Sequence, residues 1–219
     1  MQLLAMLTML IDHIGIVWFP GETVWRMIGR IAFPLYAFAL AIGYQRTRSV
    51  PRYMARLAVI AALSQLPYQL AFHKFELNVV GTLLVGLFTL AALDRLKGRR
   101  LLQGCAIAAA SALLELLPFS YGAYALALVL IYRYARASRM TPLHLAVNIA
   151  AVFYNGIGWY LQLFSLFATL LLVYAPQLLR GLDRIAVPRF VWRSFYPLHL
   201  ALIGVAALLE ASGFFSGLE

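Results

Sequence analysis

The chain has 219 residues, of which 63% are hydrophobic and only 12% are charged, and its formal net charge is +10. Soluble domains average about 25% charged residues, so this composition excludes a water-soluble globular protein. The mean hydropathy of +0.84 indicates instead a polytopic membrane protein. Because lipid offers no hydrogen-bond partners to the backbone, the membrane spans are expected to be α-helices and the fold class all-α.

Nine apolar runs are candidates for membrane-spanning helices, which need about 17–25 residues each. The first run has no basic start and carries Asp12 in its core, so we interpret it as a retained span and not as a signal peptide. The connectors are short and no internal repeat is visible, which predicts one compact domain over residues 1–219. In chain order, the predicted spans cover residues 2–20, 24–46, 54–73, 77–96, 100–117, 120–137, 142–156, 159–176 and 190–211.

The basic residues lie almost entirely at one side of these runs. Fifteen of the 18 Lys and Arg residues flank the even-numbered connectors, whereas the odd-numbered connectors hold only Lys74. The positive-inside rule therefore predicts a cytoplasmic N-terminus and an extracytoplasmic C-terminus. Topology and lipid contact explain the net positive charge, so we expect no nucleic-acid partner. The residues at the even connectors are Arg46, Arg48, Arg52, Arg56, Arg95, Lys97, Arg99, Arg100, Arg133, Arg136, Arg139, Arg180, Arg184, Arg189 and Arg193.

Polar residues inside the runs fall at similar depths, in the middle and the outer half of the predicted bundle. Charged side chains at such depths are costly, so they usually face the interior of a bundle and pair with one another. We therefore expect a single internal polar chamber. Its candidate members are Asp12, His13, Arg26, Arg30, Ser64, Gln65, Tyr68, Asn78, Glu115, Asn148, Tyr154, Asn155 and His199.

Several of these residues also have a purely structural interpretation. Asp12 is a natural counter-ion for Arg26 or Arg30, which lie one helical turn apart. Adjacent residues are about 100° apart around a helix, so Asp12 is badly placed to orient the ring of His13. Both His13 and His199 remain open to interpretation as buried structural histidines.

Two other kinds of residue have expected positional roles. Glu115, near the end of the fifth span, is expected to be a capping or interfacial acid. Pro34, Pro67 and Pro197 lie within predicted spans and are expected to kink or break them.

Six stretches, in order along the chain, resemble the TraX family. They begin with "MLIDHIG" and "RMIGRIAFPLYAFALAIGYQRTRSVPRYMARL", continue with "SQLPYQLAF", "LNVVGTLLVGL" and "YNG", and end with "FYPLHL". The matches run from the first predicted span to the ninth, so the resemblance covers most of the chain.

The resemblance implies a membrane-bound enzyme. TraX proteins are linked to N-terminal acetylation of the pilin of conjugative pili, and they are similar to a wider group of transmembrane acyltransferases. That group transfers acyl groups from cytoplasmic acyl-CoA to acceptors on the far side of the membrane. The implied donor is acetyl-CoA and the implied location is the bacterial inner membrane. Many relatives occur where no pilus is made, so a peptide amine, a sugar hydroxyl and a lipid head group all remain open as acceptors.

Acyl transfer from a thioester needs a base for the incoming amine or hydroxyl, donors for the developing oxyanion and the exclusion of water, but no metal. We assign His13 as the general base. Arg30, together with Arg26, either donates to the carbonyl oxygen or holds Asp12 so that the site is preformed. His199 is a second base or a hydrogen-bonding partner on the acceptor side.

Two further groups of residues complete the predicted site. Tyr68, Ser64 and Asn155 are weaker candidates for contacts with the acceptor or the carbonyl group. Four cytoplasmic arginines are expected to hold the phosphates of coenzyme A, because guanidinium groups suit phosphate, although the positive-inside rule alone explains them equally well. These arginines are Arg46, Arg48, Arg52 and Arg56.

Two other functions remain open. Charged residues and prolines within spans also occur in transporters of small solutes, although the matched halves of many transporters are not visible in this sequence. The other possibility is a non-catalytic membrane chaperone of an exported peptide, in which the polar residues hold the bundle together. All three functions require membrane lipid, but only the enzyme requires acyl-CoA and an extracytoplasmic acceptor.

Overall fold

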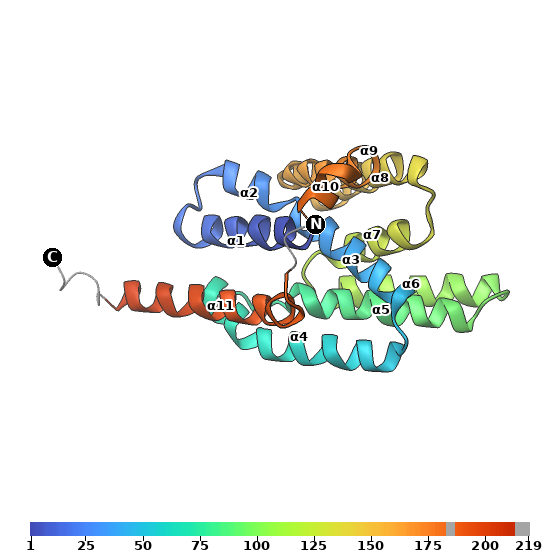
Figure 1. Ribbon diagram of the computed structural model, residues 1–219, viewed down its shortest axis with the longest axis horizontal. Helices are drawn as coiled ribbons and strands as arrows, with labels where there is room; N and C mark the ends of the chain where they lie inside the picture. Colours follow the sequence, from blue (N-terminus) through green and yellow to red (C-terminus); the bar gives the residue numbers. More distant parts are fainter. Residues whose placement is uncertain (183–186, 213–219) are drawn as a thin grey trace.

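In the computed structural model, the protein is described over residues 1–182 and 187–212. The described residues form helices, and apart from one isolated bridge between Leu77 and Phe119 they contain no β-structure. The helices lie side by side in a bundle (Figure 1). The predicted all-α class is therefore confirmed. Arg184, one of the basic residues of the eighth connector, lies outside the described residues.

Helix is present in each of the nine predicted ranges. The first half of the chain forms α1 (Gln2–Trp18), α2 (Thr23–Gly29), α3 (Ala32–Arg46), α4 (Val50–Phe72), α5 (Val79–Arg95) and α6 (Arg100–Leu116). The second half forms α7 (Gly122–Tyr134), α8 (Ala137–Asn155), the 3₁₀-helix η1 (Ile157–Ser165), α9 (Leu166–Tyr174), α10 (Pro176–Leu182) and α11 (Arg189–Ala211). The short helix α10 lies in the eighth connector, where no helix was predicted.

Three helical stretches within the described residues are long and apolar enough to cross a membrane, namely Thr23–Arg46, Ile157–Tyr174 and Arg189–Ala211. Gln2–Trp18 and Gly122–Tyr134 are apolar but shorter. Large apolar side chains are exposed on the outer faces of α4, α6, α8 and α11. Such a surface suits lipid and not water, so the chain is a membrane protein.

Two of the predicted spans contain irregular helix. The second span consists of α2 and α3, which are separated at Arg30 and Ile31, and the eighth begins as η1 before it continues as α9. Pro34 lies in the first turn of α3, where proline is tolerated. The interruption before α3 agrees with the break or kink expected at Pro34, whereas Pro67 and Pro197 lie inside α4 and α11 and do not end these helices.

Polar side chains fix where several helices begin. Ser49 and Asn78 precede α4 and α5, and the side chain of Asn78 accepts a hydrogen bond from the backbone N–H of Val80 at 3.1 Å. Glu115, in the last turn of α6, accepts a hydrogen bond of 2.7 Å from the backbone N–H of Ala123. The expected capping role of Glu115 is therefore confirmed, and it acts on the next helix, α7.

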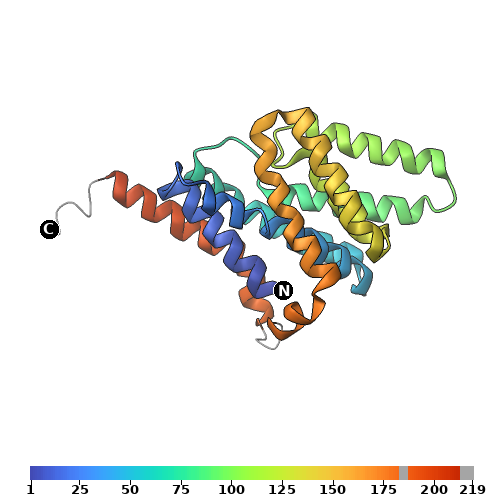
Figure 2. The same cartoon turned by 90° about the horizontal axis from the view of Figure 1, so that it is seen from above.

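The packing of the helices places the N-terminal segment inside the bundle. Helix α11 packs along α4, while α1 contacts α2, α3, α4 and α11. A cluster of buried apolar side chains comes mainly from α3, α5 and α7 and forms the core of this part of the bundle. Helix α6 lies at one edge of the bundle and α11 at the opposite edge (Figure 2). The polar residues of α1 and α2 are thereby enclosed between the α4–α11 pair and the remaining helices.

Candidate functional site

A large cavity runs through the interior of the bundle. Its volume is about 2060 Å³, and side chains from α1, α3, α4, α7, α8 and α11 contribute to its wall. Along α4, the lining extends from Tyr53 near its beginning to Phe72 at its end, a distance of about 28 Å at 1.5 Å per residue. The cavity therefore follows most of the length of the bundle.

The two ends of this cavity differ in charge. Arg46 ends α3 and Arg56 lies in the second turn of α4, and both contribute to one end, which we call the basic end. Glu76 and Glu115 line the opposite end, in the connector after α4 and in the last turn of α6. Asp12 and His13 contribute to the lining between them.

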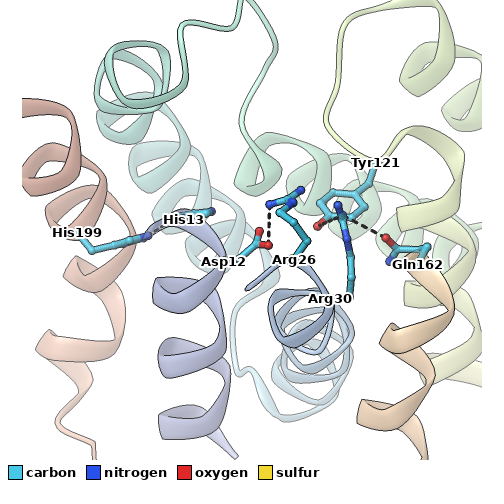
Figure 3. A network of polar contacts seen from close by, with 7 residues as sticks. All are labelled: Asp12, His13, Arg26, Arg30, Tyr121, Gln162 and His199. Atoms are coloured by element: carbon cyan, nitrogen blue, oxygen red, sulfur yellow. Dashed lines mark hydrogen bonds and ion pairs between the residues drawn. The ribbon is translucent and has the colours of Figure 1, made fainter. Parts of the chain in front are cut away.

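Two histidines from the first and last helices form a direct pair near the middle of the cavity. Nδ1 of His13 lies 2.8 Å from Nε2 of His199, and both side chains are buried (Figure 3). The rings are nearly parallel, with their centroids 5.0 Å apart. The two residues are 186 positions apart in the sequence, so only the packing of α1 beside α11 brings them together.

The hydrogen bonds of His199 determine which nitrogen of His13 is free. Nδ1 of His199 lies 2.6 Å from the carbonyl oxygen of Phe195. A carbonyl only accepts, so this Nδ1 carries the proton, and Nε2 of the neutral ring has a lone pair. Nδ1 of His13 then donates to that lone pair, which leaves Nε2 of His13 unprotonated. This is the tautomer that a general base requires.

The ring of His13 lines the cavity, whereas His199 lies behind it and contributes nothing to the lining. The edge of Phe72 packs on His13 at a centroid distance of 4.9 Å, and Tyr196 contacts the ring at 6.4 Å. In Figure 3 the second nitrogen of His13 points away from His199, toward the side on which Asp12 lies.

Asp12 is the counter-ion of Arg26, as the sequence predicted for one of the two arginines. Nη1 of Arg26 donates to Oδ1 of Asp12 at 2.6 Å. Gly29, one helical turn after Arg26, lies directly against Asp12, and a Cβ atom at that position would overlap the carboxyl group. The absence of a side chain at Gly29 therefore allows α1 and α2 to approach each other closely enough for the ion pair.

Arg30 has different partners, although it is only one turn from Arg26. Its Nη1 donates to Oε1 of Gln162 at 3.2 Å and to the hydroxyl of Tyr121 at 3.4 Å (Figure 3). Its buried Nε has no hydrogen-bond partner within the part of the chain that the structure describes. Arg30 lines the cavity, and its Nη2 forms no hydrogen bond within the described residues and is not buried, so this side of the guanidinium has donors for a bound molecule.

A buried hydrogen-bond network continues behind Arg30. Nε2 of Gln162 donates to the hydroxyl of Tyr124 at 3.0 Å, and that hydroxyl lies 3.1 Å from Nε2 of His144. The His144 ring also lies 3.0 Å from Oγ of Ser165 and 2.6 Å from Oγ1 of Thr169. His144 and Ser165 are fully buried and do not line the cavity, so this network supports Arg30 and offers no group to a substrate.

The predicted acceptor contacts are placed differently from one another. Tyr68 lines the cavity, and its hydroxyl lies 3.3 Å from Oε2 of Glu76 and 3.1 Å from Oγ of Ser120. Asn155 also lines the cavity, but it is exposed near its surface at the end of α8. Ser64 does not contribute to the lining, and its hydroxyl donates to the carbonyl of Ile60 within the same helix. Its placement argues against a contact with substrate.

The predicted phosphate-binding arginines also separate into two groups. Arg46 and Arg56 line the basic end of the cavity, while Arg48 and Arg52 do not contribute to it. Arg189 and Arg193, at the beginning of α11, line the cavity as well. The sequence assigned these two residues only to membrane orientation.

Several lining residues were not identified from the sequence. Gln162 is a single amide inside the apolar eighth span, which is a signal that a search for polar residues within spans would find. Tyr121 lies in a connector with a positive φ of 68°, and nothing in the sequence indicates that its hydroxyl reaches Arg30. Phe72 and Tyr196 were not distinguishable from other apolar side chains of their spans.

Comparison with known proteins agrees with the resemblance seen in the sequence. A family model described as "TraX protein" matches residues 1–207. The chain matches no curated protein and no solved structure. The matched residues include all of α1–α10 and most of α11. They therefore include the polar residues described above, namely Asp12, His13, Arg26, Arg30, Gln162 and His199. The chain therefore belongs to the TraX family.

Proposed function

We propose that this protein is a transmembrane acetyltransferase that uses acetyl-CoA as donor. One observation carries the proposal: a histidine with a free Nε2 lines a cavity that also holds the guanidinium groups of Arg26 and Arg30. Membership of the TraX family, which is linked to pilin processing, supports the same reaction class. The acceptor is an amine or a hydroxyl at the extracytoplasmic side.

The proposal includes a topology with nine spans over the single domain 1–219 and a location in the bacterial inner membrane. The N-terminus lies in the cytoplasm, because the basic residues flank the even connectors. The basic end of the cavity, with Arg46 and Arg56, then faces the cytoplasm, where acyl-CoA is available. Glu76 and Glu115 mark the end from which the acceptor enters.

The chemical step follows from the orientation of His13. The lone pair of the acceptor attacks the acyl carbon, and Nε2 of His13 takes the proton that the acceptor loses. The negative charge that forms on the carbonyl oxygen is stabilised by Arg30, whose Nη2 has free donors, and by the nearby charge of Arg26. The carbon–sulfur bond then breaks, and the sulfur of coenzyme A leaves as a thiolate that takes the proton back from His13.

His199 supports this step without touching the substrate. It accepts the Nδ1 proton of His13 and thereby holds the ring in the tautomer with a free Nε2. Asp12 acts on Arg26 instead, since its carboxylate accepts from that guanidinium. Among the weaker candidates, we retain Tyr68 and Asn155, which line the cavity, as contacts for the acceptor.

The proposal is tested with purified protein in liposomes, radiolabelled acetyl-CoA outside and acceptors enclosed inside. A peptide with a free N-terminal amine and a monosaccharide serve as the two acceptors. We expect labelled product from one of them, and replacement of His13 by Ala is expected to lower the rate about 10²–10⁴-fold. His73→Asn is the matched control, because His73 ends α4 at φ 52° and does not line the cavity.

Two results would contradict the proposal. Turnover that is unchanged in the His13→Ala variant would exclude His13 as the base. Movement of a solute across the liposome membrane, without any dependence on the thioester, would indicate a transporter with the same internal cavity.

A further inference from the structure

The basic end of the cavity carries more positive charge than the proposed phosphate contacts of Arg46 and Arg56 provide. Arg189 and Arg193 of α11 line the same cavity, and they lie one helical turn apart, so their side chains leave the helix on one face. All four arginines are exposed to solvent. The four residues therefore form two pairs, one from α3 and α4 and one from α11.

Within the part of the chain that the structure describes, acidic residues do not neutralise these arginines. The described acids in the cavity lining are Asp12, Glu76 and Glu115, of which Asp12 is paired with Arg26 and the other two line the opposite end. Within residues 1–182 and 187–212, none of the four arginines forms an ion pair. Orientation in the membrane requires basic residues near the surface, but it does not require them to line an internal cavity.

We infer that Arg189 and Arg193 join Arg46 and Arg56 in a binding site for the nucleotide part of coenzyme A, which is adenosine 3′-phosphate 5′-diphosphate. This inference rests on the proposed function and names its donor class, a free coenzyme A thioester. That nucleotide carries its diphosphate and its 3′-phosphate on separate positions, and two arginine pairs match two anionic groups. An acyl carrier protein presents one phosphodiester on a folded protein, and it would leave one pair without a ligand.

The spacing along α11 agrees with this donor. Arg189 and His199 are ten residues apart, which is about 15 Å along a helix axis. His199 contacts His13, so the base lies at a comparable distance from the arginines of α11. Phosphates held at the basic end would thus leave the long pantetheine arm to carry the thioester toward His13. The volume of about 2060 Å³ exceeds that of small-molecule pockets, which measure roughly 300–1,000 Å³, and suits a ligand of this length.

The experiment compares two acetyl donors that share the reacting group. Acetyl-CoA contains the nucleotide, and S-acetylpantetheine lacks it. In the double variant Arg189→Gln, Arg193→Gln, we expect the KM for acetyl-CoA to rise about tenfold or more, because charge-assisted contacts to phosphate are lost. The kcat for acetyl-CoA and both constants for S-acetylpantetheine are expected to stay at the wild-type values. Adenosine 3′,5′-bisphosphate is expected to compete with acetyl-CoA in the wild type and much more weakly in the variant.

The double variant Arg99→Gln, Arg100→Gln is the matched control. It removes the same charge from the predicted cytoplasmic side, at a position that does not line the cavity, and is expected to keep the wild-type KM. Thermal melting of each variant confirms that it is folded.

The outcomes separate this inference from the proposed function. If the wild type transfers acetyl from neither donor, the proposed function fails. If the wild type uses both donors and the α11 variant keeps its KM for acetyl-CoA, only the inference fails. An equal loss with both donors would also overturn it, because the two arginines would then act on the shared part of the donor or on the structure.

Discussion

The two nitrogens of the His13 ring have different surroundings. Nδ1 is bound by His199, whose own Nδ1 is bound to the carbonyl of Phe195, and Nε2 is on the side of the cavity. The order of donors and acceptors along this chain fixes the tautomer of both rings when they are neutral. The reactivity of His13 therefore depends on an acceptor at position 199.

His199→Ala is expected to lower kcat about 100-fold, because the ring of His13 then loses its tautomer and its orientation. The KM for acetyl-CoA is expected to stay unchanged, since His199 does not line the cavity. His199→Gln offers a carbonyl oxygen as acceptor and is expected to restore most of the rate. Steady-state kinetics of the two variants test this role, and a Gln variant as slow as the Ala variant would contradict it.

Arg30→Lys keeps the positive charge but removes the planar group with several donors. Gln162 and Tyr121 both accept from Nη1 of Arg30, and Nη2 remains for the substrate, so a single ammonium group cannot replace these contacts. We expect kcat to fall by at least about tenfold. Arg26→Lys is the comparison, because one donor is sufficient for Asp12 and a smaller loss is expected. Equal activity of Arg30→Lys and the wild type would show that the charge alone matters.

Part of the candidate functional site was predictable, because charged and polar residues are rare inside apolar runs and are easily identified there. Asp12, His13, Arg26 and Arg30 were found in this way, and the pairing of Asp12 with one of the two arginines followed from charge. The contact with His199 was not predictable, since it depends on the packing of helices 186 residues apart. Conversely, a polar residue in a span such as Ser64 can be satisfied by its own helix, and the sequence does not distinguish this case.

Arg26 and Arg30 lie one turn apart on α2, and yet their side chains contact different helices. The backbone N–H of Arg30 donates to the carbonyl oxygen of Arg26, as in a continuous helix, so both side chains leave α2 on one face. In the structure, Arg26 contacts α1 through Asp12, and Arg30 contacts η1 through Gln162. The position of α2 against α1 depends on Gly29, because only hydrogen occupies the space beside the carboxyl group of Asp12.

Gly29→Ala is expected to lower stability by about 1–3 kcal/mol, because the added methyl group would overlap Asp12 and separate α2 from α1. Gly104→Ala is the control, since a Cβ atom there meets open space on α6 and alanine favours helix by about 1 kcal/mol over glycine. Thermal unfolding in detergent measures both changes. A Gly29→Ala variant as stable as the wild type would show that α1 and α2 adjust without cost.

The positions of the helices were predicted more completely from the sequence than the irregular segments within them. Apolar length was sufficient to find helix in all nine ranges, because backbone hydrogen bonds must be satisfied within each segment in lipid. The 3₁₀ geometry of η1 is not visible, since the apolar pattern continues through it. Pro34 indicated the interruption of the second span, which lies at Arg30 and Ile31, whereas α4 and α11 continue past Pro67 and Pro197.

For the whole molecule, the orientation of the cavity decides which substrate enters from which side. Arg46 and Arg56 line one end, and Glu76 and Glu115 line the other. In the proposed topology, a cytoplasmic basic end would give a donor made in the cytoplasm direct access and would separate it from the acceptor until both reach His13. The alternation of basic connectors is the basis for this orientation.

Cysteine labelling tests this orientation. Cys105 is the single cysteine, so Cys105→Ser gives a chain without thiols. Phe75→Cys and Lys97→Cys then place one thiol in the α4–α5 connector and one in the α5–α6 connector. In intact cells, a membrane-impermeant maleimide is expected to label the thiol at position 75, and the thiol at position 97 only after lysis. The reverse pattern would place the basic end outside and contradict the proposed direction of transfer.

The most direct measurement for the central claim is an experimental structure of the protein with a non-hydrolysable analogue of acetyl-CoA. The account predicts that the nucleotide lies at the basic end beside Arg46 and Arg56, and that the carbonyl group lies between Nε2 of His13 and the guanidinium of Arg30. A ligand that binds outside the cavity, or one whose carbonyl group is separated from His13 by packed side chains, would contradict the account.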